Sequence, residues 1–354
     1  MMKKHLFMMA CMLVLCVQGS FGQARFLTWG GYPKDGNLET YFKEMHDVGL
    51  DGLLANSSVE QLKEMIPVAA KYGIEIHAWR EILSNGAIAK KHPEWLDYNR
   101  LGQSMLHKKA YVDYYKFLNP IIPGVQKAII QQLKPYAEIE GLASISLDYC
   151  RYVDAILPTT LWKKYDIVQD QVYPEWDYGY HPAMIKAFEK EYSYDPRNQE
   201  DVNGDEQWAQ FRYDAVTNLV NQIETMVRSH NKELTASPFP TPKMSRRMVY
   251  QDWGKWNLDR AYPMIYNGFY NQGTDWVGQC VADCVKDAHK GTAIYAGLYI
   301  PSFQKGANGG TLTEAVHAAL NAGAKGFALF TFDSMSKQQK KELKTVIRSI
   351  KDKK

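Results

Sequence analysis

The stretch "GLASISLD", residues 141–148, alternates apolar and small polar side chains and ends on an acid. Successive side chains of a β-strand point to opposite faces, so Ile145 and Leu147 share one face and Asp148 lies on the other with the serines. The apolar pair is suited to packing against helices. The segment is therefore predicted to be a buried strand that presents Asp148, at its carboxyl end, on the face away from those helices.

A strand-like run followed by an amphipathic helical pattern recurs eight times along the chain. The strand candidates begin near Arg25, Leu50, Ile74, Gly141, Glu233, Arg260, Thr292 and Lys325. Strands that alternate with helices imply parallel pairing, and eight units predict an α/β fold of the closed (β/α)8 TIM barrel type. An open doubly wound sheet is the alternative, but no glycine-rich phosphate-binding loop follows the first strand.

The composition is that of a folded globular protein, with 354 residues, 45% hydrophobic residues, 23% charged residues and a net charge of +3. So small a net charge does not indicate a nucleic-acid partner. The first 22 residues carry Lys3 and Lys4, then an apolar run, then Ser20 and Gly22 at the spacing that signal peptidases accept. We therefore expect a signal peptide over residues 1–22 and a single barrel domain over residues 23–354.

Export to the periplasm or the extracellular space follows from that signal. A lipid anchor ranks second, because Leu15 rather than a small residue precedes Cys16. No later run reaches the roughly 20 apolar residues of a membrane-spanning helix, so none is expected in the mature protein. The sequence does not specify an oligomeric state.

Three cysteines follow the predicted cleavage site, and an odd number argues against a disulfide framework. Cys280 and Cys284 lie four residues apart on one face of a predicted helix and are expected to be small core residues, and Cys150 is expected to be a packed thiol. The segment "DVNGDEQ", residues 201–207, fails the calcium-loop pattern because Glu206 takes the glycine position. Its acids are expected to cap a helix, so we expect no metal and no cofactor.

Two connections are unusually long, roughly 40 residues after the third strand and roughly 50 after the fourth. Both leave the carboxyl ends of strands, the face on which barrel enzymes carry their active sites. The second is rich in aromatic residues, most of which are expected to pack the loop onto the barrel. Trp162 and Trp176 are the first candidates to bind the apolar face of a ring-shaped ligand instead.

The strand phase also places acids on the predicted rim. In "IEIHAWRE", residues 74–81, it directs Trp79 and Glu81 inward, one strand away from Asp148, together with His77, which is expected to be a hydrogen-bonded interior residue. Asp333 follows the eighth strand as a third rim carboxylate. Paired carboxylates on a barrel rim suit cleavage of a glycosidic bond, and the sequence lacks a nucleophile elbow, an H-E-x-x-H motif and a Walker loop.

The order and spacing of several segments resemble the bacterial glycosyl-hydrolase-like family 10. These segments are "HPEWLDYN" (92–99), "LNPIIPGVQKAII" (118–130), "EGLASISLDYCRYVD" (140–154), "YSYDP" (192–196), "WAQFRYDAVTNLV" (208–220), "AYPMIYN" (261–267) and "GFALFTFDSM" (326–335). The family comprises exported glycoside-hydrolase-like proteins related to enzymes that cleave peptidoglycan glycan strands. The resemblance implies a TIM-barrel carbohydrate-active enzyme with Asp148 in its site and Arg151 beside it.

We therefore expect an exported glycoside hydrolase with a carbohydrate substrate and Asp148 as nucleophile or base. The candidates for the general acid are Glu81, Asp333, Glu175 and Asp177. The residues expected to bind substrate are Arg151, Trp79, Tyr149, Trp162, Trp176, Tyr266 and Tyr299. For Arg151, an ion pair with Asp148 or Asp154 is an equally weighted role. The alternative function is a glycan-binding barrel without catalysis.

Overall fold

A computed structural model describes residues 25–304 and 306–352 of the chain. The predicted signal peptide, residues 1–22, lies outside the described residues. Within the described residues, no helix combines the length and the apolar character needed to cross a membrane.

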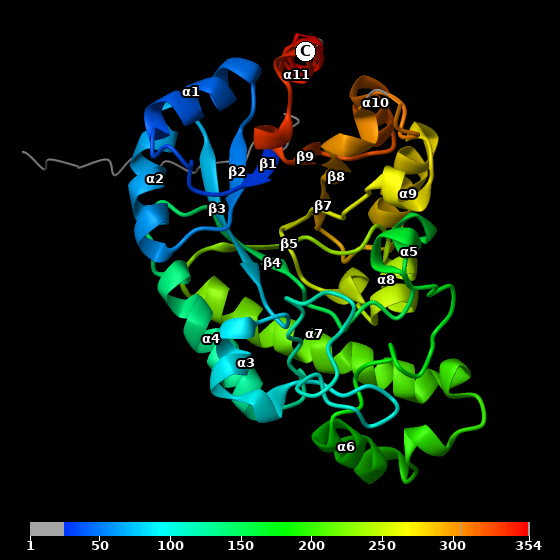
Figure 1. Cartoon of the computed structure of the whole chain (residues 1–354). Coiled ribbons are helices and arrows are strands. Elements are labelled where there is room, and N and C mark those ends of the chain that lie inside the picture. The colour runs from blue at the N-terminus through cyan, green and yellow to red at the C-terminus, as the bar shows by residue number, and fades with distance from the viewer. Residues whose placement is uncertain (1–24, 305, 353–354) are drawn as a thin grey trace, which may run out of the picture.

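The strands form one parallel sheet in chain order (Figure 1). They are β1 (Arg25–Gly30), β2 (Gly52–Ala55), β3 (Glu75–Glu81), β4 (Ser144–Asp148), β5 (Glu233–Ala236), β6 (Arg260–Ala261), β7 (Ala293–Ile294), β8 (Ala296–Tyr299) and β9 (Gly326–Phe330). Because β7 and β8 are two parts of one strand on either side of Tyr295, and pair with β6 and β9 respectively, the sheet closes on itself. The predicted TIM barrel is confirmed, and the open doubly wound alternative is wrong.

Helices surround the barrel in the expected alternation. Those that connect successive strands are α1 (Leu38–Val48), α2 (Val59–Lys71), α4 (Pro123–Ala137), α7 (Glu206–Ser229), α8 (Pro242–Val249), α9 (Thr274–Asp287) and α10 (Leu312–Asn321), and α11 (Lys337–Lys351) follows the last strand. Three further helices lie within the two long connections: α3 (Gly86–Lys91), α5 (Thr159–Tyr165) and α6 (Pro182–Tyr192). The carboxylate of Asp205 accepts a hydrogen bond from the amide of Trp208 and caps α7, which confirms the capping role predicted for this acidic segment.

The two faces of the strands separate as their alternation predicts. Ile76, Ile145 and Leu147 belong to the core between the strands and the helices. Leu54 and Tyr262 belong to a second cluster that fills the barrel interior. Since Asp148 is in phase with the interior side chains, its carboxyl points toward the barrel mouth.

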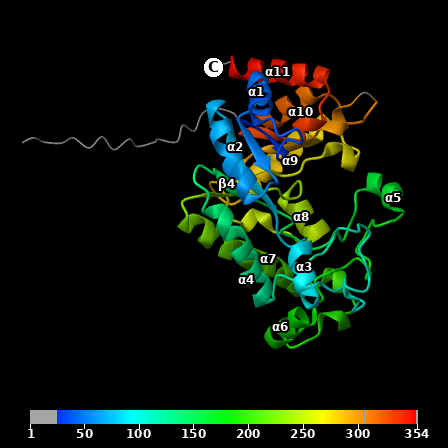
Figure 2. The same ribbon diagram turned by 60° about the vertical axis from the view of Figure 1, so that its left-hand side comes forward.

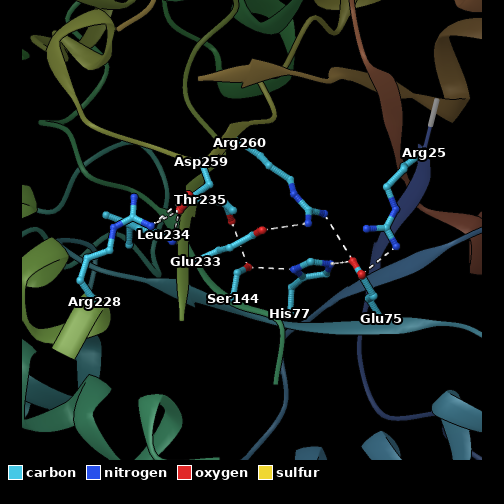
Figure 3. A network of polar contacts seen from close by, with 10 residues as sticks. All are labelled: Arg25, Glu75, His77, Ser144, Arg228, Glu233, Leu234, Thr235, Asp259 and Arg260. Atoms are coloured by element: carbon cyan, nitrogen blue, oxygen red, sulfur yellow. Dashed lines mark hydrogen bonds and ion pairs between the residues drawn. The ribbon is translucent and has the colours of Figure 1, made fainter. Parts of the chain in front are cut away.

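His77 lies in the interior, at the amino-terminal half of the barrel (Figure 3). Its Nδ1 lies 2.8 Å from the Ser144 hydroxyl, which in turn lies 3.3 Å from that of Thr235. Complete burial lowers the pKa of His77 well below its usual range, so the imidazole is neutral. The predicted hydrogen-bonded interior histidine is confirmed.

A charged layer closes the same end of the barrel (Figure 3). Arg260, the first residue of β6, lies between Glu75 at the start of β3 and Glu233 at the start of β5, at 3.4 Å and 2.9 Å. Arg25 at the start of β1 pairs with Glu75 at 2.8 Å. These ion pairs join four strand starts at the end opposite to Asp148.

The three described cysteines are buried and unpaired, which confirms the packing roles predicted for Cys150, Cys280 and Cys284. At the C-terminus, α11 buries Leu343 and Ile347 and exposes Lys337, Lys341 and Lys344, as its amphipathic pattern predicts.

Candidate active site

A cavity of about 450 Å³ opens at the carboxyl ends of the strands. Its lining from the strand ends is Trp29 of β1, Trp79 and Glu81 of β3, Asp148 of β4, Tyr299 of β8 and Phe330 of β9. The two long connections supply further lining residues. A cavity of this size, with aromatic walls and a few polar groups, is typical of a small-molecule or oligosaccharide site.

Asp148 is buried at the end of β4, with 6% of its surface exposed, and is more enclosed than Glu81, the other catalytic candidate that lines the cavity. The indole Nε1–H of Trp79 donates to its Oδ2 at 3.0 Å, and the amide of Tyr149 donates to its Oδ1 at 2.6 Å. Burial raises the pKa of Asp148 to about 6, while these two donors and the charge of Arg151 oppose the rise. The carboxyl is therefore ionised at neutral pH and held by a donor on each oxygen.

Tyr149 takes a left-handed backbone conformation, with φ of 53°. Such a conformation is uncommon for a residue other than glycine and recurs at functional sites, where the surrounding structure sustains the strain. It follows Asp148 directly, at the point where the chain leaves β4. The strained backbone of Tyr149 thus lies at the edge of the cavity, next to Asp148.

Glu81 is the cross-strand partner of Asp148, and both are the last residues of their strands. Its side chain lines the cavity and remains accessible to solvent. Partial burial raises the pKa of Glu81, and its charge contributes to the raised pKa of Asp148. The two rim carboxyl groups that the strand phase predicts to be neighbours are therefore brought together.

A third carboxyl of the cavity, that of Asp154, is held through one of its oxygens. Its Oδ2 accepts hydrogen bonds from the hydroxyls of Tyr111 and Tyr115, and it pairs with Arg151 at 3.3 Å. The Arg151 guanidinium also lies 4.8 Å from the ring centre of Tyr149. Arg151 therefore lines the cavity as the ion-pair partner of Asp154 rather than of Asp148, and it joins the two long connections.

One wall of the cavity is a continuous aromatic surface. The ring centres of Tyr266 and Tyr299 lie 5.4 Å apart, and that of Phe330 lies 6.0 Å and 6.3 Å from them. Two of the residues expected to bind substrate, Tyr266 and Tyr299, thus lie together in the cavity. Such a surface can stack on the apolar face of a sugar ring.

Trp162 and Trp176 do not line the cavity. The indole of Trp162 donates to the carbonyl of Leu157 at 3.0 Å, which ties α5 to the loop before it. The ring of Trp176 packs against Tyr111 at 5.7 Å, behind the cavity lining. The indoles of Trp162 and Trp176 therefore stabilise the second long connection rather than contact a ligand in the cavity.

The remaining acid candidates lie elsewhere. Asp177 is buried in an ion pair with Arg212 at 2.7 Å, and Glu175 is half-buried outside the cavity lining. Asp333 lies on the rim near Tyr41 of α1, also outside the lining. Of the four acids considered as proton donors, the structure places Glu81 alone in the cavity with Asp148.

Several lining residues were not singled out from the sequence. Trp29 and Phe330 share the inward phase of their strands, so strand alternation could have identified them. Tyr111, Tyr114 and Tyr115 come from the first long connection, where only the density of aromatic residues marks them. Their position depends on the tertiary fold of that connection.

The described residues contain no group of three or more histidine, cysteine, aspartate or glutamate side chains that could hold a metal ion. The reactive groups of the cavity are a buried, hydrogen-bonded carboxylate and a more accessible carboxyl with a raised pKa. Two such groups can protonate a leaving oxygen and stabilise the positive charge that develops on a sugar ring.

Solved glycosidases share this fold. The β-galactosidase from Marinomonas ef1 matches with a TM-score of 0.62 and 12% identity over 92% of this chain and 59% of that one. The α-L-fucosidase isoenzyme 2 from Paenibacillus thiaminolyticus matches with a TM-score of 0.58 and 11% identity over 93% of this chain and 49% of that one. The GH36 α-galactosidase from Geobacillus stearothermophilus matches with a TM-score of 0.53 and 9% identity over 93% of this chain and 42% of that one. The chain thus spans less than two thirds of each of these proteins, and the likeness establishes the fold.

No curated protein matches the sequence. The family described as glycosyl hydrolase-like 10 matches residues 40–300, which is most of the chain and includes β2 to β8 and both long connections. This match agrees with the resemblance seen in the sequence and with a glycosidase-like barrel. The chain therefore belongs to the glycosyl hydrolase-like 10 family.

Proposed function

We propose that the protein is a glycoside hydrolase that cleaves glycosidic bonds in a polysaccharide, an oligosaccharide or a peptidoglycan-type glycan. The observation that carries this proposal is the pairing of Glu81 with Asp148 at the ends of adjacent strands, inside an aromatic cavity. Membership of the family and the shared fold of galactosidases and a fucosidase support it.

Asp148 is proposed as the anionic partner, either nucleophile or base. Hydrogen bonds from Trp79 and Tyr149 stabilise its charged form, and an anion at this position favours the positive charge that develops on the sugar. Glu81 is proposed as the proton donor, because partial burial raises its pKa while water and the leaving oxygen can still reach it. Its proton passes to the glycosidic oxygen as the C–O bond breaks, and a water molecule then supplies the hydroxyl to the sugar and a proton back to the pair.

Product analysis tests the proposal. The purified protein and its Asp148→Asn variant are incubated with a panel of glycans that includes peptidoglycan strands, and products are separated and weighed by mass spectrometry. We expect the wild type to release products from at least one glycan and the variant to release at least about a hundredfold less in the same time. Release at the wild-type rate by the variant contradicts the assignment.

A glycan-binding barrel without catalysis is the second candidate. It is favoured by one feature: within the described part of the chain, no hydrogen bond or ion pair holds the carboxyl of Glu81. Its signature is saturable glycan binding by the wild type and by Asp148→Asn with equal affinity and no product from either.

We also propose that the protein is exported to the periplasm or beyond, on the basis of the charged, apolar and small-residue segments of residues 1–22. N-terminal sequencing of the protein from separated cell fractions tests this. The expected result is a chain that begins at Gln23 outside the cytoplasm. A cytoplasmic chain that retains Met1 contradicts it.

A further inference from the structure

The outer wall of the cavity is formed by α5 and the turn before it. Leu157, Leu161, Lys164 and Tyr165 line the cavity from this segment. None of the residues of α5 is buried, and Figure 2 shows the helix standing away from the helices around the barrel. The hydroxyl of Thr160 on its first turn donates to the carbonyl of Phe269 across the cavity mouth. Leu161, Lys164 and Tyr165 of this helix therefore face the cavity rather than a core.

The charges of the cavity are separated between its two ends. The inner end holds the acids Asp148 and Glu81. The guanidinium of Arg151 is neutralised by Asp154. Lys164, at the outer end, has no carboxylate within ion-pair distance among the described residues, and its ammonium lies 5.1 Å from the ring centre of Tyr165. Among the described residues that line the cavity, Lys164 is thus a cation without an ion-pair partner.

An aromatic cluster accompanies this cation. The rings of Tyr111 and Tyr165 lie 5.1 Å apart and join the first long connection to α5. Trp176 extends the cluster, and the ammonium of Lys108 lies 5.9 Å from its ring centre. Lys164 and Lys108 therefore contact two different rings of one aromatic cluster, of which Tyr111 and Tyr165 line the cavity. Aromatic rings beside cations match a sugar that has an apolar face and a negatively charged substituent.

We propose that the outer end of the cavity binds an acidic sugar unit, in which Lys164 pairs with a carboxylate or sulfate group and the Tyr111–Tyr165 rings contact the ring that carries it. This rests on the proposed function, because it names the class of glycan that the Asp148–Glu81 pair cleaves. Those two acids repel an anionic substituent at the reacting sugar. The acidic group therefore belongs to a neighbouring unit of the glycan, and the substrate class is acidic oligosaccharides rather than neutral ones.

Binding to the Asp148→Asn variant tests this without turnover. The probes are oligogalacturonates for the carboxylate, chondroitin sulfate oligosaccharides for the sulfate, and neutral galacto-oligosaccharides of similar length. Lys164→Met is added to this background, and Lys163→Met is the matched control, since Lys163 is exposed on the same helix and does not line the cavity. We expect Lys164→Met to weaken binding of one acidic class by about tenfold and to flatten its salt dependence. Lys163→Met and the neutral probes are expected to show no such change.

Equal binding of acidic and neutral probes, or equal losses in Lys164→Met and Lys163→Met, overturns the inference. A thermal unfolding midpoint equal to that of the Asp148→Asn background shows that the Lys164→Met protein is folded. If an acidic probe binds through Lys164 but the wild type cleaves none, the inference stands and the proposed hydrolysis fails. If the wild type cleaves neutral glycans without any effect of Lys164→Met, the hydrolysis stands and the inference fails.

Discussion

Glu81 and Asp148 are direct partners in the β3–β4 ladder and occupy the last position of each strand. A third acid of the cavity, Asp154, accepts hydrogen bonds from two tyrosines and an arginine on its Oδ2 and is the ion-pair partner of Arg151. The first two acids differ in environment, because Asp148 is enclosed and held by two donors while Glu81 is accessible. That difference is the physical basis for assigning them different roles.

Trp79→Phe should shift the pH dependence of cleavage. The active form requires an ionised Asp148, whose pKa is about 6, so kcat/KM should rise as pH rises through that value. Loss of the indole donor destabilises the carboxylate, so the acidic limb should move upward by about one pH unit. Trp29→Phe is the control, since its indole donates to Ser237 instead. An unmoved limb, or an equal shift in both variants, would falsify this role of Trp79.

Asp148→Asn should stabilise the fold at alkaline pH. The folded-state pKa of about 6 exceeds the ordinary value of 3.8, so the folded protein binds more protons between these values and loses stability as pH rises through them. Asparagine does not ionise, so the variant should gain about 1–3 kcal/mol in the free energy of unfolding at pH 8. No such gain should remain at pH 3.5. Urea denaturation at both pH values measures this, and an equal difference at both values contradicts it.

The ion pair of Arg151 and Asp154 should stabilise the two long connections. Both side chains are buried, so Asp154→Leu alone leaves an unpaired guanidinium and should cost about 3–5 kcal/mol. Arg151→Met should be costly for the same reason, and the double variant should lose less than the two single losses combined. Urea denaturation of the four proteins gives the coupling. If the loss in the free energy of unfolding of the double variant equals the sum of the two single losses, the two side chains do not stabilise the protein through their interaction.

Arg260→Met should separate stability from activity. The change leaves Glu75 and Glu233 without their shared partner and should cost about 1–3 kcal/mol, discounted because both acids are partly exposed. Its site is at the barrel end opposite to Asp148, so kcat/KM well below the melting temperature should stay at the wild-type value. Arg228→Met, which removes a more exposed pair with Asp259, should cost less than about 1 kcal/mol. A large fall in kcat/KM for Arg260→Met would contradict this separation.

Strand alternation predicts much of the inner cavity. A period of two places Trp79, Glu81 and Asp148 on the inward face, and parallel neighbours bring their carboxyl ends to one rim. The same rule applies to Trp29 and Phe330. When a cavity residue belongs to a strand, the sequence alone therefore predicts that its side chain points inward at the rim of the barrel.

The outer cavity could not be predicted in this way. The positions of Tyr111 and Lys164 depend on how two long connections fold against each other, and no local period records such contacts. Trp162 and Trp176 are examples, because the indole of Trp162 donates to the carbonyl of Leu157 and the ring of Trp176 packs against Tyr111, both within the long connections. The density of aromatic residues indicated an ordered loop but not which rings line the cavity.

The most direct test of the central claim is the rate of product release from one cleaved glycan by Asp148→Asn and by Glu81→Gln, with Asp333→Asn as the comparison rim acid. We predict that each of the first two variants loses about a hundredfold to ten-thousandfold in kcat while still binding the glycan. Asp333→Asn should retain most of the rate. Wild-type rates in Asp148→Asn or Glu81→Gln would contradict the claim that this pair performs the cleavage.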